Sequence, residues 1–107
     1  MPAHPAILNW EGNETIAEAK RLIDQRTPLE LQLPPDLHFA LFSRLCAEER
    51  NQPESVEIEG GPELLEQIAQ ISALAALADL VVPLREAGAG VRVISPSPAI
   101  LIDFKNG

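Results

Sequence analysis

Five short stretches of this chain are apolar or alternate apolar with polar residues, which is typical of β-strands. They are 6–10 (AILNW), 29–33 (LELQL), 56–58 (VEI), 91–94 (VRVI) and 99–104 (AILIDF). The alternation in the second and third stretches predicts strands with one buried face. The last stretch is expected to form either a fifth strand or a terminal apolar segment, so the predicted sheet has four or five strands.

Three longer stretches carry apolar residues at three- and four-residue steps, which predicts amphipathic helices. The first follows Gly12, and Thr15 and Glu18 have the spacing of a capping box. The second begins at 34–36 (PPD), and its predicted buried side consists of Leu37, Leu41, Phe42, Leu45 and Cys46. The third stretch, 62–88, is the longest and the most apolar.

This long stretch begins with Pro62 and Glu63, which suit the first turn of a helix. From residue 71 to residue 82 only Ser72 and Asp79 are clearly polar. This half of the predicted helix therefore has little surface for water, and we expect it to lie against the sheet or against another molecule. Pro83 predicts a break near residue 82, and the glycine at 88 predicts the end of the helix.

Two segments of the chain resemble each other without a gap: 29–37 (LELQLPPDL) and 56–64 (VEIEGGPEL). Each predicts a strand, a turn and the start of a helix. The resulting alternation of strands and helices predicts right-handed crossovers and parallel strand pairing. We therefore expect one small α/β domain over residues 1–107, with three to four helices on the sheet and a flexible lead-in at 1–5. A leucine-rich repeat is a minor alternative, because that family has a similar period.

The chain carries a formal net charge of −8, which repels phosphate backbones and argues against binding to nucleic acid. The single cysteine excludes a disulfide within the chain and favours a reducing compartment, so we expect a cytoplasmic protein. No signal peptide is evident at the N-terminus. The apolar run 71–82 is shorter than the roughly 20 residues of a membrane span, and we expect no membrane insertion.

Three segments resemble the STAS domain, the module of bacterial anti-sigma-factor antagonists: 10–23 (WEGNETIAEAKRLI), 70–77 (QISALAAL) and 85–100 (REAGAGVRVISPSPAI). The resemblance implies a STAS-like fold and a regulatory, non-enzymatic function in protein binding. Within the family's phosphoacceptor motif, Ser72 matches the acceptor, Ala73 the small residue and Leu74 the leucine. The motif's aspartate and glycine are absent. Ser72 is thus a candidate for phosphorylation, and the alternative is a small packing residue within the helix.

The implied partner is a protein, such as a kinase-like subunit or a subunit of a membrane complex. The expected partner surface comprises the N-terminal end of the long helix and the turn before it. Its candidate residues are Ser72, Ala73, Leu74, Asp36 and His38. We expect no catalytic residue, no metal and no cofactor, since only two histidines accompany the carboxylates.

Two other functions remain open. The run 71–82 could pack against its own copy or another chain, which would make the protein a structural subunit or a homodimer. Alternatively, Glu57, Glu59 and His38 could form the site of a small enzyme that uses carboxylates as acid and base or as metal ligands. An exposed acidic face is the simpler account of these glutamates.

Overall fold

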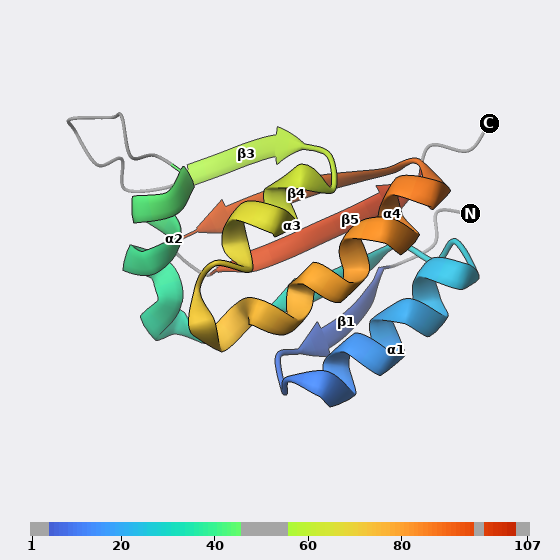
Figure 1. Cartoon of the computed structure of the whole chain (residues 1–107), viewed down its shortest axis with the longest axis horizontal. Coiled ribbons are helices and arrows are strands. Elements are labelled where there is room, and N and C mark those ends of the chain that lie inside the picture. Colours follow the sequence, from blue (N-terminus) through green and yellow to red (C-terminus); the bar gives the residue numbers. More distant parts are fainter. Residues whose placement is uncertain (1–4, 46–55, 96–97, 105–107) are drawn as a thin grey trace.

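Five strands form one mixed sheet in the computed structural model, which describes residues 5–45, 56–95 and 98–104 (Figure 1). The strands are β1 (Ala6–Asn9), β2 (Leu29–Gln32), β3 (Val56–Gly60), β4 (Ala89–Ser95) and β5 (Ala99–Phe104). Their order across the sheet is β1-β2-β5-β4-β3. The predicted α/β class is confirmed, and the terminal apolar segment is the fifth strand. The lead-in at 1–4 lies outside the described residues.

The prediction of parallel pairing holds for one pair of neighbours and is wrong for the others. β1 and β2 are parallel, whereas β2–β5, β5–β4 and β4–β3 are antiparallel. A parallel connection needs about a dozen residues or more, and β5 begins only four positions after Ser95, the last residue of β4. The two similar segments do form a strand followed by a helix. However, β2 and β3 run in opposite directions with β5 and β4 between them.

The helices lie mainly over one face of this sheet, where Figure 1 shows α1, α3 and α4 in front of the strands. They are α1 (Asn13–Asp24), η1 (Pro35–Leu37), α2 (His38–Leu45), α3 (Glu63–Ile68), η2 (Ser72–Leu80) and α4 (Val81–Ala87). None of the helices in the described part of the chain is long and apolar enough to span a membrane.

The predicted capping box at the start of α1 is not present. Gly12 is the N-cap residue, with a φ of 76°. The Thr15 hydroxyl instead accepts a hydrogen bond from the Glu11 amide at 2.6 Å and donates one to the Asn9 carbonyl at 3.0 Å. Glu18 pairs with Arg21. Thr15 therefore holds the loop between β1 and α1, which includes Trp10, in one position.

The long stretch 62–88 is not one helix but three consecutive pieces, α3, η2 and α4. The middle piece is a nine-residue 3₁₀-helix. Its large aliphatic residues, Leu74, Leu77 and Leu80, are spaced by three and are all fully buried. A 3₁₀-helix has three residues per turn, so this spacing keeps the three leucines on one line. In an α-helix of 3.6 residues per turn the same residues would rotate away from the core.

The ends of α4 agree with the sequence pattern. The chain changes from 3₁₀- to α-helix between Leu80 and Val81, close to the break expected near residue 82. Pro83 lies in the first turn of α4, where a helix does not need the missing amide hydrogen. Gly88 ends the helix in the left-handed conformation, with a φ of 67°.

We predict that Leu77→Ala lowers the free energy of unfolding by about 2–5 kcal/mol, because it leaves a cavity in the core. Leu77 is 0% exposed. Urea denaturation followed by circular dichroism measures the change. The control is Val82→Ala, since Val82 is 59% exposed and the expected change is within about 0.5 kcal/mol. Equal losses in the two variants would contradict the packing described here.

Candidate functional site

The candidate site lies where β1 and β2 end and η2 begins, and Trp10 joins these elements. The Trp10 amide donates a hydrogen bond to the Gln32 carbonyl at 2.9 Å. Its indole Nε1 donates to the carbonyl of Ala73 at 3.1 Å. Two parts of the chain that are 63 positions apart are thus held together by one side chain.

Ser72 is the first residue of η2 and is exposed. Ile71 before it is extended, with φ −77° and ψ 121°, so the backbone turns into the helix at the serine. Ala73 is exposed as well, whereas Leu74 is fully buried. Of the three matched motif residues, two face outwards, and Leu74 fastens the start of the helix to the core. A role for Ser72 in partner binding remains a prediction.

The other two partner candidates lie on the segment that follows β2. Asp36 is exposed in the short helix η1. His38 is the first residue of α2, and its side chain lies outside what the structure describes. Pro34 and Pro35, just before Asp36, line the same hollow as Trp10. The structure therefore brings the beginning of this segment to the end of the domain that carries Trp10.

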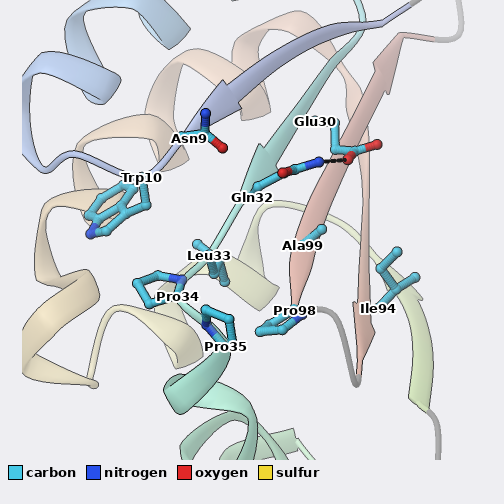
Figure 2. Close-up of a pocket in the computed structure, with 10 residues that line it drawn as sticks. All are labelled: Asn9, Trp10, Glu30, Gln32, Leu33, Pro34, Pro35, Ile94, Pro98 and Ala99. Carbon is cyan, nitrogen blue, oxygen red and sulfur yellow. Dashed lines mark hydrogen bonds between the residues drawn. The ribbon is translucent and has the colours of Figure 1, made fainter.

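A hollow of about 580 Å³ opens between these elements (Figure 2). It is lined by Asn9, Trp10, Glu30, Gln32, Leu33, Pro34, Pro35, Ile94, Pro98 and Ala99. Its size is within the range of sites that bind small ligands or side chains. Sequence analysis missed this hollow. Its residues come from four strands and the segments next to them, and only the order of the strands in the sheet brings them together.

Strand register explains the shape of the hollow. Asn9 lies opposite Gln32, Gln32 opposite Ala99, and Ala99 opposite Ile94. These residues form one row across the sheet, on the face away from the core. Ala99 has the smallest side chain of the row and is 4% exposed, so the row is lowest at its centre. Figure 2 shows the Gln32 amide between Asn9 and Glu30, and Gln32 Nε2 donates to Glu30 Oε2 at 2.8 Å.

The glutamates of the enzyme alternative lie on β3, at the edge of the sheet. Glu57 and Glu59 flank Arg92, with nitrogen–oxygen distances of 3.4 Å and 3.6 Å. Both glutamates are exposed, and such pairs contribute little to stability. Within residues 5–45, 56–95 and 98–104, no group of three or more His, Cys, Asp or Glu side chains is placed to hold a metal ion.

Glu63 has a local structural role at the turn between β3 and α3. Its Oε1 accepts a hydrogen bond from the Gly61 amide at 3.0 Å. The pKa of Glu63 is below its ordinary value, because its own backbone amide and the Gly61 amide donate to the ionised carboxylate. The carboxylate thus takes up free amides at the start of α3.

Comparison with protein-family models, with characterised proteins and with solved structures gave no match for this chain.

We predict that Trp10→Phe loosens the start of η2, because it removes the indole donor to Ala73. One neutral hydrogen bond is worth about 0.5–1.5 kcal/mol. Hydrogen exchange at the amides of residues 72–74 should become faster, while exchange in α1 stays unchanged. Unchanged exchange at residues 72–74, or a uniform rise along the chain, would show that the contact does not hold η2.

We predict a pH-dependent effect of Glu63→Gln. The pKa of Glu63 is lowered in the folded protein, so its stabilising contribution is present above the ordinary pKa of a glutamate and is lost as the pH falls through the lowered value. The stability difference between the two proteins should therefore be largest near neutral pH and should shrink in acid. Urea denaturation at several pH values measures it. A difference that stays constant down to acid pH would contradict the assignment.

Proposed function

We propose that this chain is a non-enzymatic protein-binding module, and that its partner contacts the outward side of η2. The observation that carries the proposal is the exposed start of η2, Ser72 and Ala73, on a helix fastened to the core by every third residue. The resemblance to STAS domains supports a regulatory role for this surface.

The outward rows of η2 consist mainly of small side chains. With three residues per turn, Ser72, Ala75 and Ala78 form one row, and all three are exposed. Small side chains let a partner's backbone approach closely. The buried leucines hold this surface in a single conformation, so its ordering costs little entropy on binding.

Phosphorylation of Ser72 would control this surface. Ser72 is exposed at the start of the helix, next to the carbonyl of Ala73 that accepts from Trp10. A phosphate adds about −1.5 to −2 charges at neutral pH, and desolvating that charge in an interface of alanines is costly. Modification would therefore release the partner while the core of the domain remains folded.

A photocrosslinking amino acid at Ala75 tests the proposal in cells of the source organism. We expect one discrete crosslinked product, and we expect Ser72→Glu to abolish it and Ser72→Ala to retain it. The matched control is the same crosslinker at Ala17, an exposed alanine of α1, where we expect no product.

Equal products at Ala75 and Ala17 would overturn the proposed surface. A crosslinked product at Ala75 that is unchanged by Ser72→Glu would overturn the proposed control by phosphorylation but not the proposed surface. A product of twice the mass of the 11.6 kDa chain would identify a second copy as the partner, in agreement with the homodimer considered from the sequence.

A further inference from the structure

The hollow in Figure 2 offers hydrogen-bond acceptors and a single charge. Among its described lining residues, Glu30 is the one ionisable side chain, and it is half-buried. Asn9 and Gln32 add two carboxamides on the same face of the sheet. No lysine, arginine or histidine is among the lining residues that the structure describes. Its local charge is therefore negative, like that of the whole chain at −8.

Most donors around the hollow already have partners. The indole of Trp10 donates to Ala73, its amide donates to Gln32, and the Leu33 amide donates to the Pro98 carbonyl at 2.9 Å. Pro34, Pro35 and Pro98 have no amide hydrogen to offer. Among the described residues, an anion would thus find mainly carboxamide hydrogens here. A ligand that brings its own donors is favoured instead.

Glu30 fixes the orientation of the Gln32 amide, so that the Gln32 oxygen is directed toward Asn9 (Figure 2). Gln32 uses its Nε2 to donate to Glu30 Oε2. Since the oxygen of a planar amide lies on the other side from its nitrogen, Gln32 Oε1 remains an acceptor, and Glu30 retains free lone pairs. The hollow thus combines a carboxylate with amide oxygens above an apolar floor that includes Ala99 and Ile94.

We infer that the hollow binds the guanidinium group of an arginine side chain from the protein partner. The inference rests on the proposed function, because it supplies that partner with an anchor. A guanidinium carries five donors in a plane and no acceptor, so it can pair with the Glu30 carboxylate and also reach the amide oxygen on the far side of Gln32. Its flat, weakly hydrated surface suits the prolines and aliphatic residues of the hollow better than the compact ammonium of lysine.

The negative charge of the chain supports this choice of partner. A net charge of −8 attracts a basic segment and repels an acidic one. The hollow and the start of η2 also lie at the same end of the domain, since Trp10 lines the first and donates to the second. A partner on η2 would have to reach around this end of the sheet to place an arginine in the hollow, because the hollow lies on the face away from the helices.

The probe for the test is the tripeptide acetyl-Ala-Arg-Ala-amide, with citrulline and lysine versions as controls. Citrulline has the same shape as arginine but no charge. The chain has one tryptophan and no tyrosine, so intrinsic fluorescence reports on Trp10 alone. We expect a saturable change with the arginine peptide, together with amide shifts at residues 9–10, 30–33 and 98–101. Affinity should be about tenfold weaker for citrulline, since charge-assisted hydrogen bonds are lost.

Two variants that each remove one negative charge test whether the peptide binds in the hollow. Glu30→Gln should lower the affinity for the arginine peptide by about tenfold or more. Glu59→Gln removes the same charge from the same face of the sheet, outside the hollow, and should change the affinity by less than about twofold. Equal losses in the two variants, or equal binding of arginine and citrulline, would overturn the inference.

The failure of this inference can be told apart from the failure of the proposed function. If Glu30→Gln does not alter the crosslink at Ala75 while Ser72→Glu abolishes it, the partner surface on η2 stands and the arginine anchor is wrong. If the crosslink at Ala75 is absent and the arginine peptide still binds, the hollow is a site and the surface on η2 is wrong.

Discussion

The burial of one line of leucines governs both the helical layer and the site. Leu74, Leu77 and Leu80 are fully buried, and their spacing by three matches the turn of a 3₁₀-helix. Each buried leucine contributes about 1.5–3 kcal/mol, so the core side of η2 outweighs the poorer hydrogen-bond geometry of this helix type. With the leucines inside, Ser72 and Ala73 are left at the surface.

Trp10 links the start of η2 to the sheet. Its amide continues the pairing of β1 with β2, and its indole reaches the carbonyl of Ala73. Trp10 is also among the residues that line the hollow at this end of the sheet. The start of η2 and the hollow therefore lie at the same end of the domain but on opposite sides of the sheet, because the hollow is on the face away from the helices.

Local patterns predicted the elements well. Alternation marked the strands at 29–33 and 56–58, and Gly88 marked the end of the last helix, because these signals depend on side-chain periodicity and backbone conformation alone. The three-piece division of 62–88 also had a local signal, the period of three among its leucines. The break near residue 82 was expected, but the 3₁₀ piece from Ser72 to Leu80 was not, because three- and four-residue steps were read as an α-helix.

The sequence by itself determined the α/β class, a sheet of four or five strands, the acidic charge and Ser72 as a candidate, whereas the exposure of Ser72 came from the structure. Only the tertiary structure decided the strand order, the antiparallel pairs and the hollow. The physical reason is that each site residue from Asn9 to Ala99 is placed by neighbours that are distant in the chain. Hydrogen bonds between strands set these neighbours, and a strand's own pattern shows which face is buried but not which strand lies beside it.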